Sequence, residues 1–350
     1  MIHNKMNIII AGGGFCGCLV AKYFQNDKRF NVTLIDEKNY FEYSPGIIKL
    51  ITNPNYHDKI KKNYNLFLKN VRIIRGIITK ITPKTIETKN NKSYNYDFLV
   101  ISTGIEYPIL LDNTNNVFTI KSGDEVKKLN SKIIHANKII VIGGGLIGVE
   151  TAGEIVTKYP KKELTIVHKA DRLIERNTLK TSNYAKKNLE KHGAGIIFKQ
   201  KIQKHKENVF ITDEKEKNRA DLAIWSAGIK FNPFFMKEFS NKIFSEKNAL
   251  NVNQFLQLKG NSKIFVGGDI TSIDEEKTAQ NAKRHARIII KNINRMLKNK
   301  KLKSYKIRKI PLVISLGRYN GLFTHQYFTI SGFIPAFLKW IVEKFNIYRL

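Results

Sequence analysis

The sequence predicts an α/β protein with two Rossmann-like dinucleotide-binding units. Two stretches carry this prediction: IIIAGGGFCG at residues 8–17 and VIGGGLIGVETAGE at residues 141–154. Each begins in a short apolar run and leads into a segment with helical spacing of its apolar residues. A third observation is size: 350 residues, of which 42% are hydrophobic, can bury more than one core.

The first unit reads as strand, helix and strand at residues 7–11, 16–24 and 32–36. Its glycines have the spacing that a tight turn, a close approach of pyrophosphate and a close helix–strand contact require; they are Gly12, Gly14 and Gly17. Asp36 ends the second strand about 20 residues after the turn, where its carboxylate can accept both ribose hydroxyls. The first unit is therefore predicted to bind a dinucleotide.

The second unit repeats these parts in mid-chain. Its strands are predicted at residues 138–142 and 164–167, and its glycines are Gly143, Gly145 and Gly148. The position of the acid, however, is taken by His168. A neutral imidazole does not repel a 2′-phosphate, and Lys169 and Arg172 follow closely enough to meet one. We therefore predict that NADPH is accepted alongside NADH. The competing interpretation is that His168 merely caps the strand and that backbone groups hold the ribose.

The composition is strongly basic, with 61 Lys+Arg against 29 Asp+Glu and a net charge of +32. This charge suits an anionic partner such as a phosphate-bearing cofactor, a lipid headgroup, an acidic protein or nucleic acid, although an A+T-rich genome gives a similar bias. The two cysteines, Cys16 and Cys18, indicate a reducing compartment and are expected to pack helix against strand. They lack metal-ligand partners, so no metal site is predicted. The N-terminus enters a strand almost at once, so a cytoplasmic protein is expected.

Three further segments end in small-residue turns: YDFLVISTG, ADLAIWSAG and NSKIFVGGD, at residues 96–104, 220–228 and 261–269. Together with the two glycine turns, they resemble the flavin-dependent pyridine nucleotide-disulfide oxidoreductase superfamily over nearly the whole chain. The resemblance implies that the first unit binds FAD and that an NAD(P)H-binding domain is inserted in it. The implied domains are 1–112 and 251–300 for FAD, 113–250 for NAD(P)H, and a small C-terminal domain at 301–350.

The resemblance also implies site residues. Those expected near FAD are Gly12, Gly14, Gly17, Asp36, Ile78, Thr103, Gly104, Gly268, Asp269 and Ala279. Those expected near the nicotinamide nucleotide are Gly143, Gly145, Gly148, Glu150, His168 and Gly228. Glu154 and Gln280 are the candidate catalytic residues. Glu150 and Glu154 lie one helical turn apart, where they could position nicotinamide or relay protons, and His285 is a weaker candidate for a proton shuttle.

The electron acceptor is predicted from the residues beyond the first FAD-binding segment. No cysteine lies beyond Cys18, which excludes the chemistry of disulfide reductases and sulfide:quinone oxidoreductases. A long helix is expected within residues 276–297, with Thr278 as its cap. Its start, TAQNA, resembles the segment that lines the quinone pocket of type II NADH dehydrogenases, and the region is also similar to the ferroptosis suppressor proteins. The resemblance implies an NAD(P)H:quinone oxidoreductase that does not pump protons.

The C-terminal segment, residues 331–350, predicts an amphipathic helix. One face carries the apolar residues Ile334, Phe337, Leu338, Ile341, Val342 and Phe345, with Trp340, Lys339 and Lys344 as interfacial side chains. Its apolar runs are far shorter than the roughly 20 residues that span a bilayer, so we expect it to lie on an anionic membrane surface, aided by the cationic stretch at residues 298–309. A core or dimer-interface helix is the competing interpretation. The expected location is the cytoplasmic face of a membrane.

Two other functions are compatible with the sequence. The basic charge would suit a soluble reductase that passes electrons to an acidic ferredoxin or rubredoxin. It would also suit a nucleic-acid-binding role like that of apoptosis-inducing factor, but the sequence contains no helix-turn-helix, zinc spacing or aromatic RNA platform. No nucleic acid partner is therefore predicted, and a homodimer is possible.

Overall fold

The computed structural model describes residues 5–111, 115–326 and 328–348. It divides into two compact units. Unit 1 comprises residues 1–42, 61–106 and 230–307, and unit 2 comprises residues 43–60, 107–229 and 308–350. Each unit is built on a five-stranded sheet, and each is described in turn.

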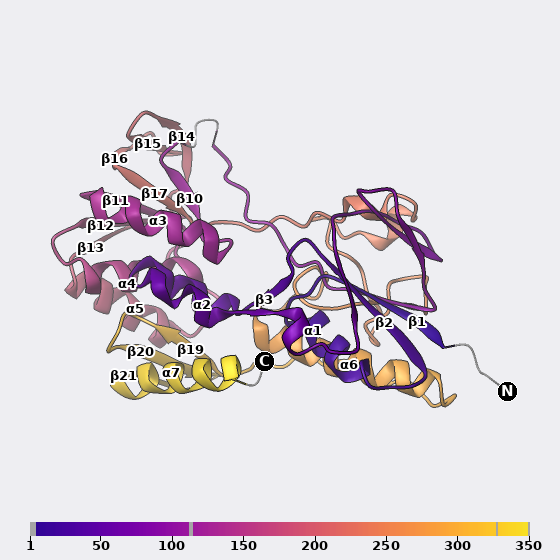
Figure 1. The fold of residues 1–350 in the computed structure, drawn as a ribbon. Helices are drawn as coiled ribbons and strands as arrows, with labels where there is room; N and C mark the ends of the chain where they lie inside the picture. The colour runs from indigo at the N-terminus through magenta and orange to yellow at the C-terminus, as the bar shows by residue number, and fades with distance from the viewer. Residues whose placement is uncertain (1–4, 112–114, 327, 349–350) are drawn as a thin grey trace. The chain divides into compact units, whose positions relative to one another are not determined.

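Unit 1 contains a parallel sheet in the order β18-β9-β1-β2-β5. The strands are β1 (Met6–Ala11), β2 (Phe30–Asp36), β5 (Arg72–Arg75), β9 (Phe98–Ile101) and β18 (Ile264–Val266). The central strand, β1, ends in a run of four buried residues, as expected for a strand of a parallel sheet that is covered on both faces. Helices α1 (Phe15–Phe24) and α6 (Ala279–Met296) lie side by side (Figure 1). The sheet brings the first glycine turn, between β1 and α1, beside the turns that follow β9 and β18.

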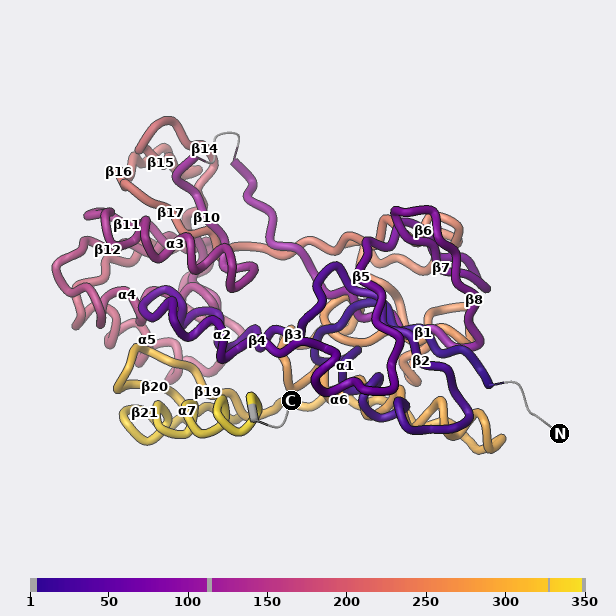
Figure 2. The backbone as a smooth tube through the Cα atoms, in the orientation of Figure 1, coloured from indigo at the N-terminus to yellow at the C-terminus, as the bar shows by residue number. Residues whose placement is uncertain are grey.

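The remaining strands of unit 1 form small antiparallel sheets (Figure 2). One consists of β6 (Ile78–Ile81), β7 (Thr85–Thr88) and β8 (Ser93–Asn95), and the other of β3 (Tyr40–Glu42) and β4 (Lys61–Asn63). Short 3₁₀ turns follow at η3 (Tyr64–Leu66), η4 (Phe234–Met236) and η5 (Asn241–Ile243). The side chains of β6 and η4 extend the apolar cluster beneath the main sheet.

Unit 2 repeats the parallel pattern in the order β10-β17-β11-β12-β13. The strands are β10 (Val117–Thr119), β11 (Lys138–Ile142), β12 (Glu163–His168), β13 (Ala194–Phe198) and β17 (Leu222–Trp225). The helices are α3 (Gly123–His135), α4 (Leu146–Lys158) and α5 (Leu179–Lys191). An antiparallel sheet of β14 (Ile202–Lys206), β15 (Val209–Thr212) and β16 (Lys217–Arg219) follows. Two parallel sheets, each with a glycine turn between its central strand and a helix, confirm the predicted fold class.

The C-terminal part of unit 2 is a three-stranded antiparallel sheet with one helix packed on it (Figure 1). The strands are β19 (Leu312–Ser315), β20 (Gly321–His325) and β21 (Phe328–Gly332), and the helix is α7 (Phe333–Tyr348). Strand β19 also contacts α4, where Gly153 lets the backbone of Leu316 approach closely. Among the described residues, no helix combines the length and the apolarity that crossing a bilayer takes.

The compact units differ from the predicted domains in two places. Residues 43–60, which form η1 (Ser44–Ile51), η2 (Pro54–Tyr56) and α2 (His57–Ile60), belong to unit 2 because η1 packs against α3 and α4. Residues 230–250 belong to unit 1. The predicted boundary between residues 112 and 113 lies outside the described residues, and the domain boundaries stay predictions.

Candidate functional site

The first glycine turn has the shape that a dinucleotide pyrophosphate needs. Gly12 has a φ of +97°, and a Cβ there would lie 2.5 Å from the Ser102 carbonyl oxygen. A Cβ at Gly17 would overlap the Gly12 carbonyl oxygen, so only glycine allows α1 to approach β1 this closely. A Cβ at Gly14 would meet nothing within 4 Å. The turn is therefore tight on its protein side and open at the helix N-terminus, where phosphate oxygens bind.

Asp36 lies beside this turn at the end of β2. Its Oδ2 accepts a hydrogen bond from the Gly13 N–H at 2.6 Å, and its Oδ1 accepts one from the Lys38 N–H at 2.8 Å. Burial raises the pKa of this carboxyl, although the two backbone hydrogen bonds oppose the shift. The carboxylate is thus fixed beside the turn, and the turn and the acid together fit FAD, while the contact of Asp36 with a ribose stays a prediction.

The second glycine turn has the same geometry. Gly143 has a φ of +111°, a Cβ at Gly148 would overlap the Gly143 carbonyl oxygen, and a Cβ at Gly145 would meet nothing within 4 Å. A hydroxyl buttresses each turn: Ser102 Oγ donates to the Gly12 oxygen at 2.8 Å, and Ser226 Oγ donates to the Gly143 oxygen at 3.0 Å. Sequence reasoning missed both serines. Their equivalent places in ISTG and WSAG, directly after β9 and β17, are the signal that could have found them.

A third turn, after β18, carries Asp269. Gly268, with a φ of +75°, donates its N–H to His285 Nδ1 at 3.0 Å. The His285 Nε2 lies 2.8 Å from Glu275, whose carboxylate also accepts from the Tyr305 hydroxyl at 2.7 Å. Burial raises the pKa of Asp269, opposed by the charges of Lys277 and His285. His285 therefore holds the turn through its Nδ1, and its predicted role as a proton shuttle stays a prediction.

Helix α6 begins as predicted. Thr278 is its N-cap, and the Thr278 Oγ1 accepts from the Asn281 N–H at 3.3 Å. Ala279 and Gln280 are its first two residues, and the side chain of Gln280 is exposed. Their predicted contacts with flavin and quinone stay predictions.

The other residues predicted near the nucleotides lie in or beside sheet turns. Ile78, predicted near adenine, packs its side chain into the apolar cluster of unit 1. Thr103 and Gly104 follow β9, and Gly228 follows β17. Gly104 and Gly228 have φ values of +76° and +75°, and a Cβ at either would meet nothing within 4 Å. Their predicted roles also stay predictions.

Unit 2 brings the two candidate glutamates of α4 into a buried charged cluster that the sequence did not predict. Lys339, on α7, donates from Nζ to the Glu150 Oε1 at 2.9 Å and to the Val313 oxygen at 3.1 Å. The same Glu150 oxygen accepts the Ser315 N–H at 2.9 Å. The interpretation of Lys339 as an interfacial cation is therefore wrong: the side of α7 that carries it packs on the unit.

A second ion pair completes the cluster. Lys49 Nζ pairs with the buried carboxylate of Glu343, and Thr52 donates from Oγ1 to the Glu154 Oε2 at 3.0 Å. Burial raises the pKa of Glu154, opposed by the Thr52 hydrogen bond and Lys49, and burial also raises that of Glu343. Burial disfavours the Lys339 ammonium, yet the charges of Glu150 and Glu343 outweigh it and raise the pKa of Lys339. The cluster can thus hold a proton that an exposed carboxylate would release.

We expect Glu154→Gln to change stability in a pH-dependent way. Because the folded pKa of Glu154 is raised, the native state retains a proton that the unfolded state loses, and stability is lost as pH rises through the folded value. The amide removes this loss, so the variant should gain in Tm relative to the wild type more at about pH 8 than at about pH 5.5. Thermal unfolding at both pH values measures this. If the difference in Tm between the variant and the wild type is equal at the two pH values, the raised pKa of Glu154 is contradicted.

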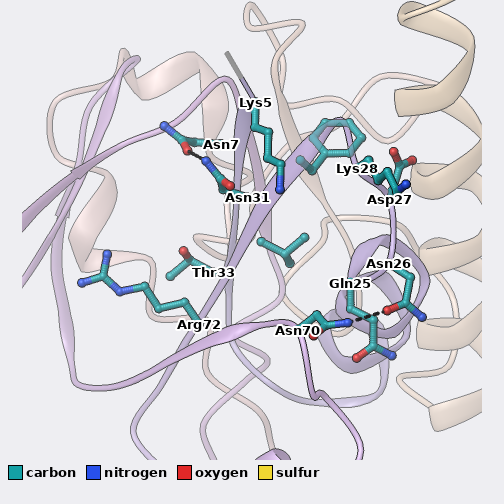
Figure 3. A pocket seen from close by; sticks show the side chains of 12 residues that line it. Lys5, Asn7, Gln25, Asn26, Asp27, Lys28, Asn31, Thr33, Asn70 and Arg72 are labelled. Atoms are coloured by element: carbon teal, nitrogen blue, oxygen red, sulfur yellow. Dashed lines mark hydrogen bonds between the residues drawn. The ribbon is translucent and has the colours of Figure 1, made fainter. Parts of the chain in front are cut away.

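One hollow of unit 1 lies apart from these turns. It is lined by polar side chains near the amino ends of β1 and β2, among them Asn7 and Asn31, which are hydrogen-bonded at 3.3 Å (Figure 3). Ligands of parallel α/β sheets bind at the carboxyl ends of the strands. The glycine turns lie at those carboxyl ends, so this hollow is not the candidate site.

Comparisons with known proteins identify a family whose model covers both glycine turns. The family model described as pyridine nucleotide-disulphide oxidoreductase matches residues 6–286. Apoptosis-inducing factor homolog B of Dictyostelium discoideum is 33% identical, over 92% of this chain and 90% of its own. The type II NADH:quinone oxidoreductase of Staphylococcus haemolyticus (strain JCSC1435) is 24% identical, over 100% and 97%.

Solved structures share the fold. The structure of NDH2 from Plasmodium falciparum in complex with NADH superposes with a TM-score of 0.86 and 17% identity, over 99% of this chain and 97% of that one. The family match, the Asp36 site and the two glycine cradles lead to one conclusion. The chain belongs to the pyridine nucleotide-disulphide oxidoreductase family and is an FAD-dependent oxidoreductase that uses NADH or NADPH.

Proposed function

We propose that this enzyme is a non-pumping NAD(P)H:quinone oxidoreductase of the type II NADH dehydrogenase kind. FAD, when bound, accepts a hydride from the nicotinamide and passes on two electrons. A relative that carries this name aligns with the whole chain, which supports a quinone as acceptor. The cysteines support it too: Cys16 and Cys18 are buried, and burial raises the pKa of both thiols. Neither can supply the thiolate that disulfide or sulfide chemistry requires.

The proton-holding cluster of unit 2 is the observation that carries the proposal. Reduction of a quinone to the quinol by NADH takes up one proton from solution, whereas reduction of two ferredoxin or rubredoxin molecules by NADH releases one. Burial raises the pKa of Glu154, which lies in the helix that begins at the second glycine turn, so its carboxyl keeps a proton more readily than an exposed carboxyl does. The Glu150 carboxylate, which accepts from the Lys339 ammonium at 2.9 Å, lies one helical turn before Glu154 on α4 and is a second group that can accept a proton. An acceptor that consumes protons suits this arrangement better than a one-electron carrier.

The experiment that tests this compares acceptors. NADH oxidation by the purified, FAD-loaded protein would be measured with a short-chain ubiquinone, a menaquinone analogue and a ferredoxin. We expect a quinone to give the highest kcat/KM, with little dependence on salt. The alternative, a ferredoxin or rubredoxin reductase, is favoured by the net charge of +32. A faster reaction with ferredoxin that slows steeply as salt rises would support that alternative and overturn the proposal.

The proposal includes peripheral attachment to an anionic membrane through α7. The apolar side chains predicted for its outer face are all exposed, including Ile334 at 65% and Phe345 at 52%. Three rings are stacked along it: the centroids of Phe333 and Phe337 lie 6.2 Å apart, and those of Phe337 and Trp340 lie 5.7 Å apart. A contiguous aromatic face beside cations such as Lys344 suits the interfacial region of a bilayer.

We expect the triple change Phe333→Ser, Phe337→Ser and Trp340→Ser to release the protein from anionic vesicles. Each ring removed takes away apolar area that would otherwise enter the interface, so binding should fall at least about tenfold. Vesicle co-sedimentation measures this, with Tyr319→Ser as a control at an exposed aromatic of another segment. Deletion of α7 would be a poorer test, because it also removes the buried Lys339 and Glu343. Unchanged binding by the triple variant would count against membrane attachment.

The quinone-side role of Gln280 and Ala279 belongs to the same proposal, as do the predictions of a possible homodimer and of no nucleic acid partner. Gln280 is exposed and is the second residue of α6.

A further inference from the structure

The structure brings an acid to the place in unit 2 where the sequence has none. Strand β12 ends at His168, whose side chain is buried. The His168 Nε2 lies 3.3 Å from the Glu175 Oε2. Because a carboxylate can only accept here, Nε2 carries the proton and holds Glu175 beside the end of the strand. A histidine, His168, thus occupies the strand-end position where an acid is usual. The acid in this chain is Glu175, seven residues later, which His168 holds by a hydrogen bond.

Glu175 is held by its backbone as well. The Ile174 N–H donates to the Gly144 oxygen at 2.8 Å, which ties the segment to the second glycine turn. Arg172 donates from Nη2 to the Glu175 carbonyl oxygen at 2.7 Å. Gly144 itself is packed tightly, since a Cβ there would lie 2.9 Å from the His168 ring and 2.6 Å from Leu173. The carboxylate therefore has a defined position next to the turn that cradles the nucleotide.

The position next to this turn and at the end of the second strand is where dinucleotide-binding folds meet the adenosine ribose. An acid there accepts hydrogen bonds from the ribose hydroxyls, and it repels the 2′-phosphate of NADPH. The Glu175 side chain is 41% exposed, so a ligand can reach its free lone pairs. Arg172 would favour the phosphate, but its Nη2 is already bound to the Glu175 carbonyl oxygen.

We propose that Glu175, held by His168, is the residue that makes NADH the preferred nucleotide. Since the carboxylate is partly exposed, solvent screens its repulsion of a 2′-phosphate, and we expect a preference of about tenfold. NADPH still binds, as the sequence predicted, but more weakly than NADH. The inference concerns the electron donor only, and it deepens the proposed function on that side.

The test measures binding as well as turnover. The FAD-loaded wild type and Glu175→Gln would be titrated calorimetrically with ADP and with its 2′-phosphorylated form, and KM would be measured for NADH and NADPH. We expect Glu175→Gln to remove the preference, by raising the affinity for the 2′-phosphorylated probe about tenfold relative to ADP. Glu175→Asp, which keeps the charge, should keep the preference for the unphosphorylated probe.

Asp171→Asn is the matched control, because it removes the same charge from an exposed position four residues before Glu175, which is the acid that lies beside His168. The ratio of its affinities for ADP and for 2′-phosphorylated ADP should equal that of the wild type. An unchanged ratio in Glu175→Gln, or an equal change in Asp171→Asn, would overturn the inference. The ratio of the two affinities is measured without an electron acceptor. Its result therefore does not depend on whether the enzyme reduces a quinone.

Discussion

Gly148→Ala is expected to weaken NADH binding about a hundredfold while leaving FAD in place. The added Cβ would overlap the Gly143 carbonyl oxygen and lie 2.8 Å from the Ser226 Oγ, and backbone atoms cannot yield as a flexible side chain would. The N-terminus of α4 must therefore move away from the turn. Its N–H groups then no longer point at the pyrophosphate, and a displacement of this kind costs about a hundredfold in affinity or rate. Overpacking adds a loss of about 1–3 kcal/mol in the free energy of unfolding.

The flavin separates this effect from general unfolding. The glycine turn proposed to hold FAD, formed by Gly12, Gly14 and Gly17, lies in unit 1, so the variant should keep its yellow colour and still be reduced by dithionite. Calorimetric titration with NADH and single-turnover reduction of the flavin measure the loss. Gly195→Ala, on β13 of the same unit, is the control, since its Cβ would lie at an ordinary 3.4 Å from the Thr165 side chain. Normal NADH binding by Gly148→Ala, or loss of FAD, would contradict the assignment of the two cradles.

The sequence was sufficient for the parts of the site that depend on local spacing. Both glycine turns, the strand-end Asp36 and the Thr278 cap lie where the pattern predicted them, because a turn and a cap are determined by a few consecutive residues. The cysteines follow the same logic: both are buried at the start of α1, and Cys16 packs closely against Gly267, as their place in the first glycine turn implies.

The contacts that could not be predicted join residues far apart in the chain. Lys339 meets Glu150 across 189 positions, and Ser102 reaches Gly12 across 90. The periodicity of α7 predicted its apolar face. It could not predict that Lys339 on the other side is buried, because the sequence of one helix does not show which distant carboxylate pairs with its lysine. Glu175 was missed for a related reason: the local pattern places the ribose acid at the strand end, and the recruited residue lies beyond the reach of that rule.

Lys339→Met is expected to destabilise the protein by about 3–5 kcal/mol, because it leaves the Glu150 carboxylate buried without a cation. The remaining partner of that oxygen is the Ser315 N–H, and two further acids of the cluster, Glu154 and Glu343, would share Lys49 as their nearest cation. Urea-induced unfolding measures the loss. Lys344→Met on the same helix is the control, since that ammonium is exposed and lies 4.8 Å from the Trp340 ring centroid.

The double variant Glu150→Gln and Lys339→Met tests whether the Glu150–Lys339 pair serves the stability of the fold or the reduction of quinone. It removes both charges together, so most of the lost stability should return, and the double-mutant cycle should give a coupling of at least about 2 kcal/mol. If the cluster supplies protons to the acceptor, the same variant should be stable yet slow in the reoxidation of its reduced flavin by quinone. Flavin reduction by NADH is measured separately, because Glu150 is also predicted to lie near the nicotinamide nucleotide. Equal stability of Lys339→Met and the wild type would contradict a buried pair. If the double variant reduces quinone as fast as the wild type, the two charges serve only the fold. Replacing a buried ion pair by uncharged side chains costs little stability, so a normal rate would leave no chemical role for the pair.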